Sequence, residues 1–291
     1  MQIRMRLLVP ACAIALFLLT AQSHETALFS PQDLRLPAVP GSVRFAVIGD
    51  SGTGGRHQYD VGALMARVHG VFPFDVVLMC GDNIYGPESL GNFRRKFEQP
   101  YQALLDRGVK FYAALGNHDG RRQLDYAPFH MNGQRYYSFA VGSVRFCAID
   151  SNDLDPPQLR WIEGELRRSV EPWKICFLHH APYSSARRHG SQLGVRQKLE
   201  PLFVACGVRV AFSGHDHVYE RIRPQNGIYY FVSGAAAHLR YRNLRPSPLT
   251  ASGFDLDRSF IVVEVAGETL HFQTISRTGN TVDSGMIRLA P

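Results

Sequence analysis

The chain has 291 residues, of which 45% are hydrophobic and 20% are charged, which is the composition of an ordinary globular protein. This composition excludes a disordered chain, and no segment after the N-terminal region is apolar for long enough to span a bilayer. The formal net charge is +7. This modest surplus can attract an anionic substrate, but it does not indicate nucleic-acid binding.

Residues 1–23 are predicted to be a secretory signal peptide. Arg4 and Arg6 precede an apolar run at residues 7–19, and a small-residue cleavage site follows at residues 21–23. The apolar run is too short to cross a bilayer, and a buried N-terminal helix is the alternative. Cleavage is expected after Ser23, which predicts a secreted or periplasmic protein with no stable membrane anchor. Cys12 lies too early in the run for a lipid attachment site.

Residues 24–40 contain several prolines and are expected to form an extended lead-in to a single domain, residues 41–291. The first half of this domain alternates short apolar strands with helices, whereas the second half favours strands alone. That order predicts an α/β fold with two packed sheets and helices outside. Strands are predicted at residues 43–48, 76–80, 109–115, 136–139, 144–149, 174–178, 208–212, 228–232, 259–265, 270–275 and 286–289, and helices at residues 59–68, 93–105, 156–166 and 192–206.

Side chains with metal-binding atoms follow five of the predicted strands. Each one alone would more often be a turn, cap or polar surface residue. Together they predict a metal site, because strand ends meet at one edge of a sheet and gather their ligands there. A glycine precedes the donor in four of the five loops and permits a sharp turn. The side chains at these strand ends are Asp50, Asp82 with Tyr85, Asn117 with His118, His180, and His215 with His217.

The strand-end residues form five short motifs. They are Asp50-Ser51-Gly52, Gly81-Asp82-Asn83-Ile84-Tyr85, Gly116-Asn117-His118-Asp119, Phe177-Leu178-His179-His180 and Gly214-His215-Asp216-His217. With these motifs the sequence resembles the calcineurin-like metallophosphoesterases, and among them the small purple acid phosphatases, from about residue 43 to residue 236. Tyr85 discriminates most, because related phosphodiesterases and protein phosphatases have no tyrosine ligand there. The implied fold is a four-layer α/β/β/α sandwich of two mixed sheets flanked by helices.

The resemblance also implies that Asp82 bridges two metal ions. A phenolate and carboxylates form a hard anionic set that suits Fe(III), whereas imidazoles and an amide oxygen suit Fe(II), Zn(II) or Mn(II). The expected cofactor is therefore Fe(III) plus a divalent metal. The implied ligands are Asp50, Asp82, Tyr85 and His217 for the first ion and Asp82, Asn117, His180 and His215 for the second.

The fourth motif departs from the family pattern, which has Val-x-x-His, because two histidines are adjacent here. His180 is favoured as the ligand, since residues 180–182 keep the His-x-Pro form of relatives. His189 then falls where mammalian-type members place a substrate-facing histidine. His179 is assigned a supporting place in the strand, and the choice between the two stays open.

The expected reaction is hydrolysis of small-molecule phosphate monoesters by attack of a metal-bound hydroxide. His118 and His189 are expected to bind the phosphate or to protonate the leaving group, with an ordinary loop position as the alternative for each. Arg187 and Arg188, beside His189, are candidates for binding a second anionic group, although a solvated loop is favoured.

Asp119 and Asp216 follow or separate the predicted donors and are expected to orient neighbouring imidazoles. Two other functions stay open, namely a phosphodiesterase or nucleotidase on the same metals and a binding module that has lost catalysis. The sequence leaves the physiological ester, the divalent metal, the pH optimum and the oligomeric state undetermined.

Overall fold

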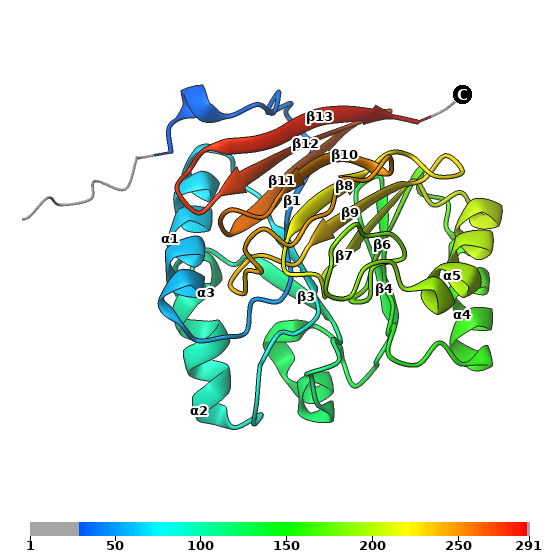
Figure 1. The fold of residues 1–291 in the computed structure, drawn as a ribbon, viewed down its shortest axis with the longest axis horizontal. Helices are drawn as coiled ribbons and strands as arrows, with labels where there is room; N and C mark the ends of the chain where they lie inside the picture. The colour runs from blue at the N-terminus through cyan, green and yellow to red at the C-terminus, as the bar shows by residue number, and fades with distance from the viewer. Residues whose placement is uncertain (1–28, 290–291) are drawn as a thin grey trace, which may run out of the picture.

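Two mixed β-sheets pack face to face in the computed structural model, which describes residues 29–289 (Figure 1). The first sheet has the strand order β13-β12-β11-β1-β2-β3, and the second has the order β10-β8-β9-β7-β6-β5-β4. Strands β1, β2 and β3 are parallel to one another, as are β5, β6, β7 and β9. The strands are β1 (Val43–Ile48), β2 (Val76–Cys80), β3 (Lys110–Ala114), β4 (Tyr137–Val141), β5 (Val144–Ala148), β6 (Trp173–Phe177), β7 (Val210–Ser213), β8 (Tyr219–Ile222), β9 (Tyr229–Ser233), β10 (Thr250–Phe254), β11 (Ser259–Ala266), β12 (Thr269–Ser276) and β13 (Thr281–Arg288).

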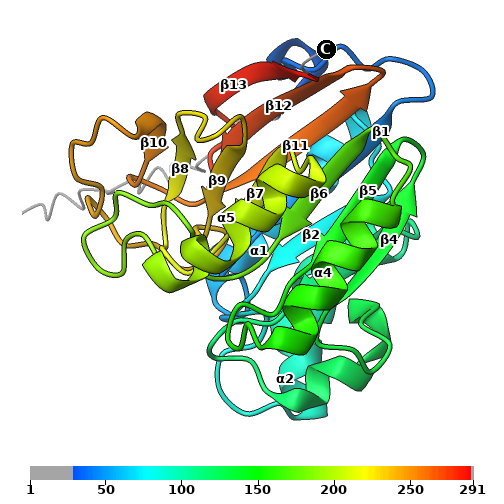
Figure 2. The same ribbon diagram turned by 90° about the vertical axis from the view of Figure 1, so that its right-hand side faces the viewer.

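Helices cover the outer face of each sheet, with α1 and α3 over the first sheet and α4 and α5 over the second (Figures 1 and 2). Ile162 of α4 and Phe203 of α5 are buried in one cluster with Cys147 and Cys176 of the second sheet. The predicted four-layer sandwich is therefore confirmed. The helices are α1 (Arg56–Val71), α2 (Leu90–Phe93), α3 (Gln99–Leu105), α4 (Pro156–Arg168) and α5 (Leu193–Cys206).

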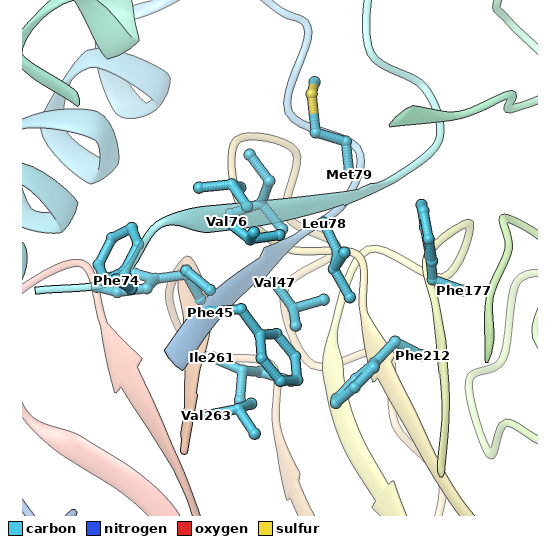
Figure 3. Packing of buried hydrophobic residues seen from close by; sticks show 14 of the residues in the cluster. Phe45, Val47, Phe74, Val76, Leu78, Met79, Phe177, Phe212, Ile261 and Val263 are labelled. Carbon is cyan, nitrogen blue, oxygen red and sulfur yellow. The ribbon is translucent and has the colours of Figure 1, made fainter. Parts of the chain in front are cut away.

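Aromatic and aliphatic side chains fill the space between the sheets (Figure 3). The ring of Phe45 on β1 lies 5.1 Å from that of Phe146 on β5 and 6.1 Å from that of Phe212 on β7, in edge-to-face contact with both. All three rings are fully buried. Edge-to-face pairs of this kind contribute roughly 0.5–1.5 kcal/mol beyond their buried area. The packing holds the carboxyl ends of β1 and β7 on the same side of the molecule.

The predicted helix at residues 93–105 is interrupted in the structure. It begins at Leu90, widens into a π-type turn at Arg94–Glu98, and continues as α3. Pro100 has no N–H to donate to the carbonyl of Lys96, and the buried side chain of Gln58 donates to that carbonyl instead, at 2.5 Å. A proline inside a helical pattern thus explains the difference.

Two strands of the second sheet, β8 and β10, were not among the predicted strands. β8 begins two residues after His217. The metal-binding motif therefore leads almost directly into the strand, and almost nothing in the sequence between them marks where the strand begins. β10 has the sequence Thr-Ala-Ser-Gly-Phe and forms an edge of the sheet, where little apolar surface is required. All of the strands that were predicted are present, and the ends of most of them are shifted by a few residues.

The described part of the lead-in runs along β11 and β12. The buried carboxylate of Glu264 accepts the N–H groups of Ala38 at 2.8 Å and Val39 at 2.6 Å, and the Gln273 side chain accepts that of Arg35 at 2.7 Å. The predicted signal peptide, including Cys12, lies outside the described residues. Between residues 29 and 289, no helix has the length and apolar character needed to cross a membrane.

Candidate metal centre

Loops that follow the carboxyl ends of strands in both sheets meet at one place, and hydrogen bonds donated by the backbone join them. Asp50 follows β1 and Asp82 follows β2, and the Asp50 N–H donates to Gly81 O at 3.0 Å. The second sheet is tied to this pair, because the His215 N–H donates to Asp50 Oδ2 at 2.8 Å. The donor-bearing loops are therefore fixed relative to one another by the backbone and not only by packing.

Three of the predicted ligands have left-handed backbone conformations. Their φ angles are +53° for Asp50, +53° for Asp82 and +69° for His215. Non-glycine residues seldom adopt such angles, and they cluster at functional sites where the surrounding structure enforces them. The turn is therefore made largely by the donor residues themselves.

Two of the neighbouring glycines allow their loops to approach the aspartates closely. A Cβ atom on Gly116 would lie 2.2 Å from Asp82 Oδ1, and one on Gly214 would lie 2.5 Å from Asp50 Oδ2. Neither glycine has a positive φ angle. The expectation that a preceding glycine makes the sharp turn holds for Gly81, whose φ is +83°, but not for these two.

Asp50, Tyr85 and His217 form the first group of donors. The Tyr85 hydroxyl donates to Asp50 Oδ1 at 3.2 Å and lies 3.4 Å from His217 Nε2, which is itself 3.2 Å from Asp50 Oδ1. Burial raises the pKa of Asp50, and the charge of Asp82 raises it further. Burial and the same two carboxylates raise the pKa of Tyr85. A carboxylate and a phenolate both become stable here only beside a cation.

Asp82, Asn117, His179 and His215 form the second group. His179 Nε2 lies 2.9 Å from Asn117 Oδ1, 3.1 Å from His215 Nδ1 and 3.5 Å from Asp82 Oδ1. The other ring nitrogen of His179, Nδ1, lies 2.9 Å from the carbonyl oxygen of Cys80 and donates its proton there. Such a second hydrogen bond leaves Nε2 unprotonated and orients it as a ligand.

The two adjacent histidines of the fourth motif both face this group. His180 Nδ1 lies 2.9 Å from Ser151 Oγ, and the His180 ring lies 4.5 Å from that of His215. His179 is fully buried and approaches both Asp50 and Asp82 closely enough to share an ion with them, whereas His180 shares such a grouping only with His179 and His215. His179 therefore lies nearer to both aspartates than His180 does, and the choice of ligand between the two histidines stays a prediction.

The imidazoles of the site are held in the neutral form that binds metals. Burial lowers the pKa of His215 to about 2, with further lowering by the neighbouring histidines. Burial and the Arg240 charge lower the pKa of His217 to about 4. The pKa of His179 is likewise lowered by burial and by His180. Histidine binds a metal through an unprotonated ring nitrogen, so these side chains need lose no proton at neutral pH.

The donor set fits a pair of metal ions. Asp50 and Asp82 are 0% and 1% exposed, and the partners that lie within ion-pair distance of them among residues 29–289 are the imidazoles of His217 and His179. Two buried carboxylates with neutral neighbours are an uncompensated charge, which costs several kcal/mol in a protein interior. Cations bound between the two groups of donors would remove that cost.

His118 and His189 lie at the mouth of the site and are exposed. The His118 N–H donates to Asp82 Oδ1 at 3.0 Å, and its ring lies 5.1 Å from that of Tyr85. The ring of His189 lies 4.0 Å from that of His215. Beside His118 is a cleft of about 500 Å³, which Arg122 also lines. The structure thus brings both histidines to the predicted centre, from opposite sheets.

Asp119 and Asp216 do not orient imidazoles, so that expectation is wrong. Asp119 accepts the N–H groups of Gly116 at 2.8 Å and Ile84 at 3.1 Å, and Asp216 accepts that of Gly190 at 3.1 Å. Short aspartates close to the chain find backbone donors more readily than a ring several residues away. Both carboxylates therefore fix the loops that carry the donors.

Sequence reasoning missed two residues of the site, His238 and Arg240. The ring of His238 lies 4.7 Å from that of His217, nearly parallel to it, and 4.4 Å from that of Tyr85. The Arg240 N–H donates to the carbonyl of His217 at 2.9 Å. Both residues follow β9 after a stretch of glycine and alanine, and the signal in the sequence was a histidine and an arginine after small residues.

Two mixed sheets between helices, with carboxylate, amide, phenol and imidazole donors at the strand ends, define a metallophosphoesterase. The family model described as calcineurin-like phosphoesterase matches residues 43–219, and the chain belongs to this family. The resemblance stated from the five motifs is thereby confirmed, and the protein is a metal-dependent phosphoesterase.

Curated relatives carry the names of purple and tartrate-resistant acid phosphatases. The chain is 28% identical to purple acid phosphatase 17 of Arabidopsis thaliana, over 79% of this chain and 83% of the relative. It is 24% identical to human tartrate-resistant acid phosphatase type 5, over 88% and 95% of the two chains. Among solved structures, the yellow lupin purple acid phosphatase PPD1 superposes with a TM-score of 0.71 at 19% identity, covering 87% of this chain and 55% of that one.

Proposed function

We propose that this protein is an exported phosphomonoesterase that works through two metal ions, with Fe(III) in one position and a divalent ion in the other. The observation that carries the proposal is the meeting of two adjoining groups of donors around buried Asp82. One group is phenolic and anionic and suits Fe(III), and the other is richer in neutral imidazole and suits Fe(II), Zn(II) or Mn(II). The names of the relatives support the monoester as substrate.

Each ion would be held by donors that lie together in the structure. When bound, the two ions supply an activated water molecule and neutralise the charge of the phosphoryl oxygens. The proposed ligands are Asp50, Asp82, Tyr85 and His217 for Fe(III), and Asp82, Asn117, His215 and a histidine of the 179–180 pair for the divalent ion, with His179 favoured by its distances.

His118 and His189 would bind the phosphate ester or protonate its leaving group. Both rings are exposed at the mouth of the centre, on opposite sides of it, and so both face solvent from which a substrate enters. An imidazole in this place can donate a hydrogen bond to a phosphoryl oxygen or a proton to the departing alkoxide, which typically accelerates a reaction by roughly 10² to 10⁴. The cleft beside His118 offers room for the leaving group.

Comparing chromogenic phosphate monoesters and diesters, with the metal content of the same preparation, tests this function. The metal-loaded protein is expected to hydrolyse the monoester faster and to contain two metal ions per chain. Faster turnover of the diester would indicate a phosphodiesterase or nucleotidase. If neither ester is hydrolysed by protein with two bound ions, the binding-module alternative gains support.

The variant Asp82→Asn, which changes the proposed bridging residue, gives a second test of the function. Asparagine has the shape of aspartate and tolerates the positive φ of this position, so the loop is expected to keep its fold. Loss of the bridging charge should remove hydrolysis and metal together. Hydrolysis that persists in Asp82→Asn at the original rate contradicts the proposed centre.

Export is the part of the proposal that rests on residues 1–23 alone. The mature protein is expected to begin at His24 when the full chain is expressed in a secreting host. Sequencing the N-terminus of the secreted product checks this. An N-terminus that retains residues 1–23 would show that the segment is not a cleaved signal.

A further inference from the structure

The segment that follows β9 is bound to the donor loops through its backbone. The His238 N–H donates to Asp50 O at 3.2 Å, and the Arg240 N–H donates to His217 O at 2.9 Å. These bonds attach the segment to one loop from each sheet. Arg240 is therefore held beside the metal centre and does not lie on a free surface loop.

Among the residues that the structure describes, the guanidinium of Arg240 has no opposite charge to pair with. It forms no ion pair with any carboxylate between residues 29 and 289, and its Nε is buried without a hydrogen-bond partner. A buried donor left without a partner destabilises the folded protein. An arginine that is fixed next to an anion-binding centre and lacks a partner is therefore a candidate for binding the ligand of that centre.

The electrostatic influence of Arg240 reaches the rings around the centre. Burial lowers the pKa of His189, and the Arg240 charge lowers it further. The same charge acts on His217 and His238. The guanidinium thus lies within Coulombic reach of His189, on the edge of the site where a substrate enters.

We propose that Arg240 binds the phosphoryl oxygens of the substrate and sets the preference for monoesters. The planar guanidinium matches the geometry of phosphate oxygens and remains charged at every working pH. A monoester carries close to two negative charges near neutral pH, whereas a diester carries one. A cation added to the two metal ions therefore favours the monoester. This inference rests on the proposed function and names the group that selects its substrate.

Arg187 and Arg188, which the sequence suggested as candidates for binding a second anionic group, are less suitable for this role. Both side chains are exposed on the loop that carries His189. Exposed arginines lose more side-chain freedom on binding a ligand than an arginine whose side chain is already partly buried. Arg240 is half-buried with its Nε enclosed, so it needs less such ordering.

Titration of the metal-loaded protein with inorganic phosphate, followed by calorimetry, tests the proposal at equilibrium. Arg240→Met is expected to weaken phosphate binding by about 10- to 100-fold, which is the usual effect of losing hydrogen bonds to a charged group. Arg240→Lys should fall between the two, since it keeps the charge and loses the planar fork. Arg242→Met is the matched control, because Arg242 is exposed two residues away and stacks on Tyr241. It should bind phosphate as the unsubstituted protein does.

Substrate preference gives a second measurement. Arg240→Met should lower kcat/KM for a monoester by a larger factor than kcat/KM for a diester. Equal phosphate affinity with and without Arg240 overturns the proposal, and so does an equal loss in Arg242→Met. If Arg240→Met also binds less metal, Arg240→Lys decides the matter, because unchanged phosphate affinity in a fully loaded lysine variant overturns it.

Failure here is distinguishable from failure of the proposed function. An unsubstituted protein that hydrolyses no monoester contradicts the function. An active enzyme whose phosphate affinity does not depend on Arg240 contradicts only this inference.

Discussion

Tyr85 lies against two carboxylates, and its pKa is raised by burial and by the charges of Asp50 and Asp82. Those surroundings oppose the phenolate strongly in the metal-free protein. Only a cation with high charge density reverses that preference, because it must outweigh two nearby negative charges as well as burial. The hydroxyl is therefore a sensitive reporter of which ion occupies the first group of donors.

Replacing this hydroxyl gives the first prediction. The iron-loaded protein should be purple or pink because of charge transfer from tyrosinate to Fe(III), and Tyr85→Phe should lose the visible absorption band. Absorption spectra with iron determination on the same samples check the result. A colourless unsubstituted protein with full iron occupancy would contradict the role of Tyr85, and a coloured Tyr85→Phe variant would do so as well.

The adjacent histidines give the second prediction. His179→Ala should bind one metal ion fewer, because its Nε2 lies between Asn117, His215 and Asp82. The expected loss of metal affinity exceeds the roughly 10- to 100-fold that removal of a supporting residue costs. His180→Ala should retain both ions. Metal analysis after dialysis compares the two variants, and the reverse result would restore His180 as the ligand.

Backbone geometry at the strand ends places the donors, which leads to a prediction at the scale of the element. A methyl group on Gly116 would lie 2.2 Å from both the backbone nitrogen and Oδ1 of Asp82. The two loops cannot then keep their present separation. Gly116→Ala should therefore lose metal and at least about 10²-fold in activity although every donor remains, since small displacements at a catalytic centre have effects of this size.

A second glycine provides the control for Gly116→Ala. Gly194 lies in α5, and a Cβ atom added there would have no atom within 4 Å beyond its chain neighbours and the backbone of its own helix, so Gly194→Ala should keep full activity and stabilise the helix by up to about 1 kcal/mol. Metal content and urea unfolding of both variants are the measurements. Normal metal binding by Gly116→Ala would show that the loops tolerate more space than the contacts indicate.

Strand-loop units were predictable from sequence because each ends in a chemical signal. The strands before Asp50 and Asp82 were placed at their observed bounds, since an apolar run stops at a glycine followed by a donor. Strand β10 gave no such signal, because an edge strand satisfies only part of its backbone and needs few apolar residues.

Contacts between distant loops were the part of the site that sequence could not supply. The partition of donors into two groups was implied by the family resemblance, but the choice between His179 and His180 depends on which ring points toward Asn117. His238 and Arg240 reach the centre only because β9 lies beside β7 in the second sheet. Adjacency of this kind is a property of topology, which no local pattern of residues encodes.

At the scale of the whole molecule, the proposed metal centre would join the two sheets. Asp50, Asp82 and Asn117 come from the first sheet, and His179, His215 and His217 come from the second. Bound ions would therefore cross-link residues more than a hundred positions apart and would neutralise two buried carboxylates. Since the unfolded chain offers no comparable site, metal binding stabilises the folded state by mass action.

Removing the metals should therefore lower the thermal stability of the entire domain in one transition. Free metal at about a thousand times its dissociation constant adds roughly 4 kcal/mol, and a chain of this size shifts by about 2–4 °C per kcal/mol, so chelation should lower Tm by roughly 10 °C. Calorimetry before and after chelation measures the shift, and returning the metal should reverse it. Asp82→Asn should respond little to chelation because it already lacks the proposed bridging ligand. If loaded and chelated forms of the unsubstituted protein melt at the same temperature, then the ions do not link the sheets, and the donors of the two sheets act without a shared pair of cations.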